Sequence, residues 1–329
     1  MAKTRFVTGL ESCRSLWEAV AEPKNVFDLW SFRACFQRHF HSRPSFLLLE
    51  DKGCVTGMLP LCYSQEQDMF LFFPGEVWKS KTWIERTPVY AKDNHDLLAL
   101  LDACPERTYL RYMDLRNGPV QEILSVDELG YVLYPGRLHQ DIAAYYRRFS
   151  GKKFKNLTRA IQSLVGESTV FHVNRLEDFD LLVDMSLSRY GEDSYLWDQR
   201  FRESFRDVML FLYGRGMLRM VSLEIEGKTV AVDLGALCNN IYTVFLGGTD
   251  PDTPGVAKVM NRNHIEFAFQ HGVSKVDFLC GDFHWKQLWH LDEEPLYKFV
   301  SPSLTREEAL TGIFPADVSP VKVQALYSP

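Results

Sequence analysis

Two stretches of the chain share one pattern of short apolar runs around a glycine turn. Residues 46–62 and 218–238 each read as two apolar strands joined by a turn that contains Leu-Glu-x-x-Gly. Glycine supplies the positive φ that such a tight hairpin needs. A third apolar strand follows each hairpin, at 69–73 and 241–246. The pattern predicts two copies of one mixed α/β unit, divided near residue 138.

Between the two copies, apolar residues recur at steps of three and four, which predicts a helix over 140–165. Two further helices are expected at 176–190 and 199–213. Four cations spaced by four, three and four residues share another face of the first helix: Arg148, Lys152, Lys155 and Arg159. Two interpretations stay open for this face: a solvated surface, or a docking surface for the phosphates of a cofactor or an RNA.

A strand-helix-strand pattern follows the second hairpin. The strand 241–246 is expected to end at the glycine-rich segment 247–252. Thr253 can cap a helix and Pro254 suits its first position, so we expect a helix to about residue 270. The next strand, 275–280, should lie parallel to the first, as crossover connections require.

Composition narrows the class of protein. The 329 residues carry 37 basic and 43 acidic side chains, a net charge of −6, and 46% are hydrophobic, as in ordinary globular proteins. Disorder of the bulk is excluded, no apolar run approaches the roughly 18 residues of a membrane span, and the start lacks the apolar core of a signal peptide. The length predicts about two domains, and a cytoplasmic location is expected.

Seven cysteines, an odd number without a C-x-x-C pair, argue against a disulfide framework or a zinc site, so we expect no metal. Reduced buried thiols are the plain interpretation. The other is a nucleophilic Cys280, which ends a predicted strand beside Asp282 and His284.

The chemistry is expected to lie where strand 241–246 leads into the next helix. A helix N-terminus offers unpaired N–H groups suited to a phosphate, Gly255 and Ala257 leave room for close approach, and Lys258 adds a charge. A purely structural turn is the other interpretation.

Two groups of polar residues are further candidates. Asp233 lies inside an apolar strand, where a carboxylate is a catalytic base or acceptor ligand, half of a structural ion pair, or simply exposed at an edge. Asp282, His284 and Lys286 cluster after the second strand, either as acceptor contacts or as a chance polar loop.

These residues resemble a known family. Asp252-x-x-Gly255-x-Ala257 is similar to the Gln/Arg-x-x-Gly-x-Gly/Ala loop of GCN5-related N-acetyltransferases (GNAT). The fuller resemblance, over about 145–290, is to the acyltransferase-like domain of CelD-type and FemABX-like proteins. Four features carry it: the basic helix 152–159, the strand end 245–248, the helix start at Pro254-Gly255, and the closing motif 277–289.

The resemblance implies an α/β (α+β) fold made of tandem GNAT-like domains, two mixed central sheets flanked by helices. Residues 1–138 would be a degenerate copy, 139–302 the acyltransferase domain and 303–329 a C-terminal arm. It also implies acyl-CoA or acetyl-CoA as co-substrate, with an N–H near Leu246 or Gly247 polarising the thioester carbonyl. The donor would lie against Leu246, Gly247, Gly248, Pro254, Gly255, Val256, Ala257 and Lys258.

The resemblance further places Asp233, Asp282, His284 and Lys286 on the catalytic side, with Lys286 matching the family lysine as an anion or carbonyl ligand. Two departures from the family pattern keep other functions open. The negative charge of Asp252 opposes the binding of a phosphate, and the indole of Trp285 cannot protonate a departing thiolate. The first hypothesis is an N-acyltransferase acting on a small-molecule or peptidyl amine. The second is FemABX-like transfer from aminoacyl-tRNA, docked on the basic helix, and the third is a non-catalytic binding module.

Overall fold

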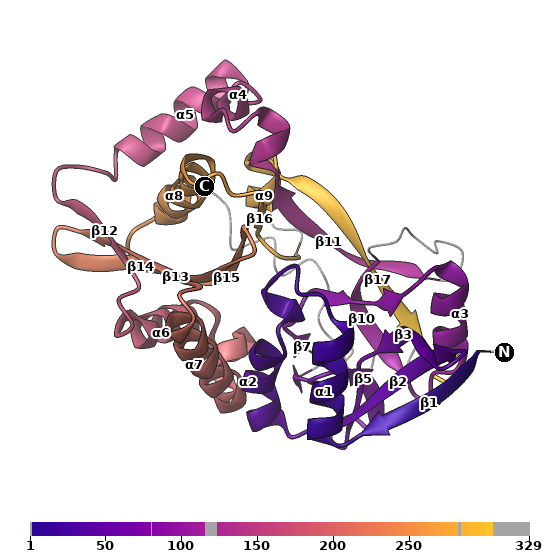
Figure 1. Cartoon of the computed structure of the whole chain (residues 1–329). Helices are drawn as coiled ribbons and strands as arrows, with labels where there is room; N and C mark the ends of the chain where they lie inside the picture. Colours follow the sequence, from indigo (N-terminus) through magenta and orange to yellow (C-terminus); the bar gives the residue numbers. More distant parts are fainter. Residues whose placement is uncertain (1, 80, 116–123, 282–283, 305–329) are drawn as a thin grey trace. The chain divides into compact units, whose positions relative to one another are not determined.

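The computed structural model describes residues 2–79, 81–115, 124–281 and 284–304 (Figure 1). Two compact units make up the chain. The first unit comprises 1–23, 27–129 and 295–329, and the second comprises 24–26 and 130–294. Apart from the short segment 24–26, the chain passes between them at 129/130 and 294/295, whereas the expected boundaries were 138 and 302. Most of the expected arm, 303–329, lies outside the described residues.

The first unit is built on a six-stranded sheet. The strand order is β5-β4-β2-β3-β9, with β1 beside β2, and all of these pairs are antiparallel. These strands are β1 (Lys3–Thr8), β2 (Arg43–Asp51), β3 (Cys54–Leu59), β4 (Leu61–Ser64), β5 (Met69–Phe72) and β9 (Tyr90–Ala91). The unit also contains α1 (Leu10–Val20), η1 (Val26–Asp28, shared with the second unit), α2 (Trp30–Phe40), β6 (Val77–Trp78), β7 (Lys81–Thr82), β8 (Thr87–Pro88), α3 (Asn94–Asp102) and β10 (Tyr109–Asp114).

The second unit is a layered α/β structure. Its strands are β12 (Thr169–Val173), β13 (Leu218–Ile225), β14 (Lys228–Cys238), β15 (Ile241–Thr249) and β16 (Lys275–Asp277), followed in the sheet by β11 (Ser125–Leu133). β11 and β17 (Asp292–Val300) each begin in one unit and end in the other. The pairs are antiparallel except β15 with β16, which are parallel as predicted.

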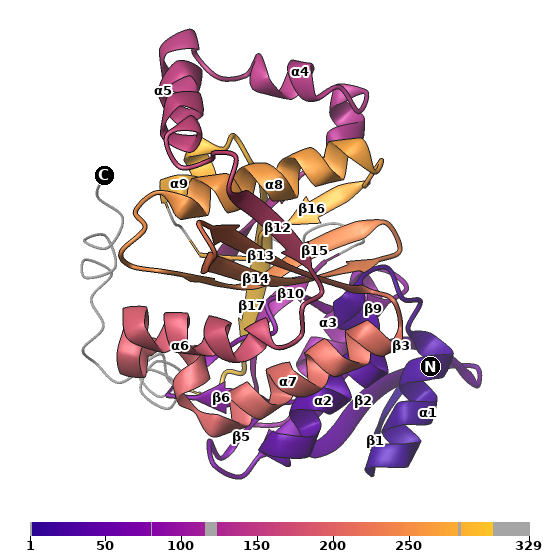
Figure 2. The same cartoon turned by 90° about the vertical axis from the view of Figure 1, so that its left-hand side faces the viewer.

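Helices cover both faces of this sheet. In Figure 2, α8 (Val256–Gln270) covers one face with α5 (Gly151–Gln162) beyond it, while α6 (Asp178–Tyr190) and α7 (Gln199–Gly214) cover the other. The remaining helices of the unit are α4 (Ile142–Tyr146), α9 (His284–Leu288), η2 (Pro135–Leu138), η3 (Gly191–Asp193) and η4 (Tyr195–Trp197). None of the helices in the described part of the chain is long and apolar enough to cross a membrane.

The two predicted hairpins are confirmed, and they match in register. Both turns hold two residues at positive φ, Lys52-Gly53 and Glu226-Gly227. The strand pairs correspond one to one: Leu49 with Gly57 and Leu223 with Ala231, then Glu50 with Val55 and Glu224 with Thr229. Each hairpin therefore has a β-bulge at the same place, with one extra residue in its second strand. This shared irregularity supports two copies of one unit.

The predicted helix over 140–165 is wrong as one element, because the chain forms α4 and α5 with a break between them. Ser150 causes the break: its backbone is extended and its hydroxyl accepts from the N–H of Lys153 at 3.4 Å. A serine that caps a new helix interrupts the previous one even where the apolar periodicity continues. The helices expected at 176–190 and 199–213 are confirmed as α6 and α7.

The strand expected at 241–246 does not end at its glycine pair but continues through Gly247 and Gly248 to Thr249. Both glycines are needed for close approach. A Cβ on Gly247 would lie 2.5 Å from Oδ1 of Asp233, and a Cβ on Gly248 would lie 3.0 Å from the carbonyl oxygen of Leu182 in α6. The glycines therefore admit one neighbour on each face of the sheet.

Candidate active site

Strand β15 continues beyond the end of its pairing with β16. They pair only from Ile241 to Thr243, opposite Lys275 to Asp277. The chain after β16 then follows β11: the N–H of Phe278 donates to the carbonyl of Tyr131 at 2.9 Å. Within the described residues, no strand pairs with 244–249 on the β16 side of β15. The main-chain groups of that edge therefore have no strand partner among the described residues.

A β-bulge lies on the same stretch of β15. Leu234 of β14 faces Leu246, whereas the next residue, Gly235, faces Val244, so Phe245 is the extra residue. Bulges change the direction of main-chain groups and are frequent beside active sites. The sequence placed a carbonyl-polarising N–H near Leu246 or Gly247, and the bulge lies directly before these two residues.

The loop between β15 and α8 is organised by a buried carboxylate, Asp250. Its oxygens accept from the N–H of Asp252 at 3.2 Å and from the hydroxyl of Thr253 at 3.1 Å. Lys228 pairs with it at 2.5 Å, and this bond lowers the pKa of Asp250. The predicted helix start is therefore wrong, because Asp250 engages Thr253 in the loop and α8 begins only at Val256.

Gly255 directly precedes α8 with a φ of +88°, a conformation that favours glycine. Among the other candidate donor residues, Val256 is buried, whereas Gly247, Ala257 and Lys258 are exposed. The first-turn N–H groups of a helix have no intrahelical acceptors and suit an anion. Asp252, three residues before Gly255, is exposed.

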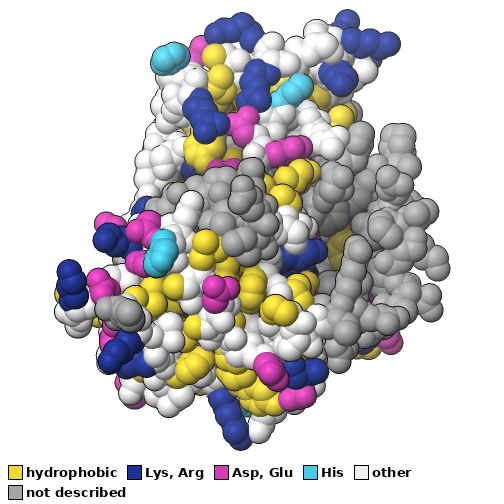
Figure 3. All heavy atoms as spheres, turned by 90° about the vertical axis from the view of Figure 1, so that its right-hand side faces the viewer, with side chains coloured by type: hydrophobic (Ala, Val, Ile, Leu, Met, Phe, Trp, Pro, Cys, Tyr) yellow, Lys and Arg dark blue, Asp and Glu magenta, His cyan; other side chains and the backbone are white. Residues whose placement is uncertain are grey.

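The expected basic face is divided by the break before α5. Lys152, Lys155 and Arg159 are exposed on α5, but Arg148 precedes it and lies 3.5 Å from Asp292. Lys and Arg side chains gather at the top of Figure 3, where α4 and α5 lie in Figure 1. Leu164, just beyond α5, would lie 3.5 Å from a Cβ on Gly255, so this helix ends beside the loop before α8.

Asp233 does not stand alone, because it has a buried histidine partner. Its Oδ2 lies 2.7 Å from Nε2 of His264 in α8, and Nδ1 of His264 lies 2.8 Å from the hydroxyl of Tyr242 in β15. Sequence reasoning missed His264 and Tyr242. A signal was present: His264 lies on the apolar stripe of α8 at steps of four from Val256, Met260 and Ala268.

Lys286 is buried, and its ammonium group binds the protein's own backbone. It donates to the carbonyls of Leu279, at 3.0 Å, and Cys280, and lies 5.0 Å from the ring centroid of Tyr131. Leu279 has a positive φ of 61°. Lys286 therefore holds the main chain where it leaves β15 for β11, and Cys280, the alternative nucleophile, is buried there.

Two of the other candidates cannot be placed. Asp282 lies outside the described residues, and His284 begins α9 with a side chain that also falls outside them. The structure therefore brings Asp233 close to Gly247, while Lys286 stabilises the segment after β16.

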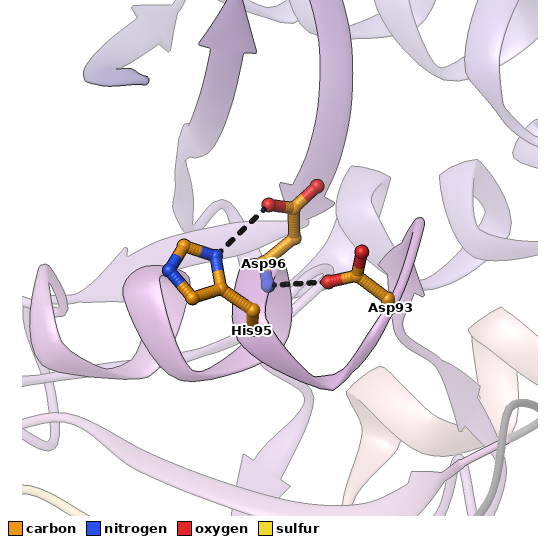
Figure 4. Close-up of side chains that lie close together, drawn as sticks. All are labelled: Asp93, His95 and Asp96. Carbon is orange, nitrogen blue, oxygen red and sulfur yellow. Dashed lines mark hydrogen bonds and ion pairs between the residues drawn. The ribbon is translucent and has the colours of Figure 1, made fainter. Parts of the chain in front are cut away.

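A cluster in the first unit has a structural explanation. Asp93, His95 and Asp96 lie close together in Figure 4. Asp93 caps α3 by accepting from the N–H of Asp96 at 3.0 Å, and Nδ1 of His95 lies 3.6 Å from Oδ1 of Asp96. Helix capping accounts for this arrangement.

Comparison with known proteins agrees with this geometry. Residues 151–287 match a family model described as an acetyltransferase (GNAT) domain. No curated protein matches the chain.

Three solved structures share the fold over nearly the whole chain. FemX has 11% identity and a TM-score of 0.56, covering 91% of this chain and 97% of its own. L-PGS from Bacillus licheniformis has 12% identity and a TM-score of 0.52, covering 89% and 96%. The C-terminal domain of a putative lysylphosphatidylglycerol synthetase from Agrobacterium fabrum has 12% identity and a TM-score of 0.51, covering 91% and 95%. At these identities the likeness concerns the fold.

The α/β, tandem GNAT-like fold expected from the sequence is therefore confirmed. Residues 151–287, which contain Asp233, the open edge of β15 and the start of α8, match an acetyltransferase (GNAT) domain, and the chain as a whole has a FemX-like fold.

Proposed function

We propose that the protein transfers an acyl group from a coenzyme A thioester to a primary amine on a small-molecule or peptidyl acceptor. The observation that carries this proposal is the separation of β15 from β16, next to the bulge at Phe245 and ahead of α8. The carbonyl oxygen of a thioester bound along this open edge accepts a hydrogen bond from a main-chain N–H of β15. Its pyrophosphate reaches the first turn of α8, where Gly255 leaves room.

The chemistry assigns a role to Asp233 in this proposal. The acceptor arrives as an ammonium ion, and Asp233 takes one proton from it. The amine nitrogen then attacks the thioester carbon, and the N–H of the bulge region stabilises the oxyanion. The carbon–sulfur bond breaks as the amide forms, and the second proton of the nitrogen passes through water to the departing thiolate.

Isothermal titration with acetyl-CoA and longer acyl-CoAs tests the donor. We expect binding that Gly255→Asp abolishes, because the new anion and Cβ occupy the phosphate position. Gly216→Asp is the matched control, since Gly216 also has a positive φ (65°) and open space around it. Its variant should keep the affinity. Absence of binding at every chain length would refute a coenzyme A donor.

A second candidate donor is an aminoacyl-tRNA. It is supported by the FemX-like fold over the whole chain, by the exposed cations of α5, and by Asp252, whose charge opposes a pyrophosphate. Gel-shift titrations should then show tRNA binding that weakens steeply with salt. Replacing Lys152, Lys155 and Arg159 together by alanine should reduce that salt dependence, and no retention at low salt would rule this donor out.

A further inference from the structure

A chain of side chains runs behind Asp233, between the sheet and α8. Asp233 and His264 are joined at 2.7 Å, and His264 and Tyr242 at 2.8 Å. The three residues come from β14, α8 and β15. His264 and Tyr242 are almost completely buried, with 1% and 0% exposure, whereas Asp233 keeps 8%. The end of the chain nearest solvent is therefore the carboxylate.

Arg219 of β13 lies at the other end. Its guanidinium carbon lies 5.5 Å from the ring centroid of Tyr242 and 3.7 Å from that of Phe267, and its Nη2 donates to Oδ1 of Asn263 at 2.9 Å. Burial raises the pKa of Tyr242, which keeps its phenol protonated, although the positive charge of Arg219 works against this rise. The buried chain thus has a cation at one end and an anion at the other.

The charges at the two ends determine which ring nitrogen of His264 carries a hydrogen. An ionised carboxylate only accepts hydrogen bonds, so Nε2 of His264 must carry the hydrogen that lies between it and Asp233. In a neutral imidazole Nδ1 is then the acceptor, and the hydroxyl of Tyr242 donates to it. With this tautomer, both hydrogen bonds of the imidazole are satisfied and point from the Arg219 end toward Asp233. Aligned hydrogen bonds of this kind strengthen one another.

The chain also fixes where the second carboxylate oxygen lies. Oδ1 of Asp233 lies against the main chain of β15 at Gly247, so closely that a Cβ there would be 2.5 Å away. Gly247 is exposed and follows the bulge. Oδ1 is therefore the oxygen that lies over β15 at Gly247, while Oδ2 is occupied by His264.

We propose that His264 and Tyr242 are positioning residues: Tyr242 holds His264 as the neutral Nε2–H tautomer, and His264 holds Asp233 with Oδ1 against Gly247 of β15. This proposal rests on the proposed acyl transfer, in which Asp233 removes the proton from the amine. Neither positioning residue touches the acyl donor. They keep the base in one orientation, which matters because a shift of about 1 Å in a catalytic group can lower a rate by about 10²-fold.

The tautomer can be measured without substrate. In long-range ¹H–¹⁵N spectra of histidine-labelled protein, the signals that disappear in His264→Gln belong to His264. We expect them to show a protonated Nε2 and an unprotonated Nδ1 at neutral pH, and Tyr242→Phe should mix the two tautomers. An Nδ1–H tautomer or an imidazolium in the wild-type protein would overturn the proposal.

Turnover then separates positioning from simple structural support. With acetyl-CoA and an amine acceptor, His264→Leu should lower kcat by about 10²-fold at an unchanged KM for acetyl-CoA. His264→Gln should keep most of the rate, because its amide N–H can replace Nε2–H, although both variants lose the same imidazole packing. Equal losses in the two variants, in parallel with their thermal stability, would contradict positioning. If the wild-type protein turns over no acyl donor, the proposed function fails, while the spectra still decide the tautomer.

Discussion

Asp233 shows how one residue gains a role only from its surroundings. Within its strand it is a carboxylate among apolar residues, and the sequence left three interpretations open. The structure gives it a histidine partner at 2.7 Å and a buried position, with 8% exposure, beside Gly247. A buried carboxylate with one bonded and one directed oxygen suits a base better than an exposed edge residue.

Asp233→Asn should therefore lower kcat by about 10²–10⁴-fold, the usual contribution of a general base, with little change in acyl-CoA affinity. Steady-state kinetics and titration measure the two effects. Asp178→Asn is the matched control, because Asp178 is also buried but is engaged by Arg175 at 2.6 Å and by Ser222. It should reduce stability and leave kcat nearly unchanged. A similar fall of kcat in both variants would argue against the assignment.

Another buried carboxylate, Glu76 in the first unit, has a structural role. It accepts from the hydroxyl of Thr82 at 2.8 Å and the N–H of Ile84 at 2.9 Å. With Arg33 it lines a cavity of about 30 Å³. Burial raises the pKa of Glu76 above its ordinary 4.5.

This raised pKa predicts a pH dependence of stability. The folded protein holds the Glu76 proton more tightly than the unfolded chain, so its contribution is complete below about pH 4.5 and is lost as the pH rises through the folded-state pKa. Denaturant unfolding of the wild-type protein and Glu76→Gln should show a difference in unfolding free energy that shifts against the wild type with rising pH. A difference that stays constant between pH 4 and 8 would contradict this.

Strand β15 carries several of the features that make up the candidate site. One strand carries Tyr242, the bulge at Phe245 and the pair Gly247-Gly248, and it leads into the loop of Asp250. The two glycines face opposite layers, because successive residues of a strand point to opposite faces. Their substitutions should therefore have different effects.

Gly247→Ala should displace the carboxylate of Asp233 and lower kcat by about 10²-fold with a modest loss of stability. Gly248→Ala should instead press on the backbone of α6 at Leu182 and cost about 1–3 kcal/mol of unfolding free energy, as overpacking does. Kinetics and denaturant unfolding of both variants measure the contrast. If Gly247→Ala retained full activity, the placement of Asp233 at this edge would be wrong.

Across the whole chain, the two hairpins are the clearest sign of duplication. Their turns share positive φ at equivalent residues, and their bulges fall at the same step from the turn. The second unit also contains the bulged strand β15 with its open edge. The copies thus share a framework, and the candidate site belongs to the second.

Equivalent turns should respond equally to substitution. Gly53 and Gly227 have φ of +80° and +79°, with open space around both. Changing either to alanine should cost roughly 1–2 kcal/mol, the penalty of a left-handed conformation for a residue with a Cβ. Denaturant unfolding of the two single variants measures this, and clearly unequal losses would show that the turns are not equivalent.

The sequence by itself determined the hairpins, most helices and the parallel pair of β15 and β16, because these depend on local periodicity and on glycine and capping residues close in the chain. It failed where local signals compete: Ser150 divides a continuous apolar stripe, and the glycine pair looked like a turn although the neighbours Asp233 and Leu182 require it inside a strand.

Only the tertiary structure decided the partners of the buried polar groups. Asp233, Tyr242 and His264 lie 9 to 31 residues apart in the chain, and the sheet and α8 bring them together. Likewise, Lys286 binds the carbonyls of Leu279 and Cys280 because the chain leaves β15 for β11 at that point. Hydrogen-bond partners are selected by burial and strand register, and neither is encoded in the spacing of any single motif.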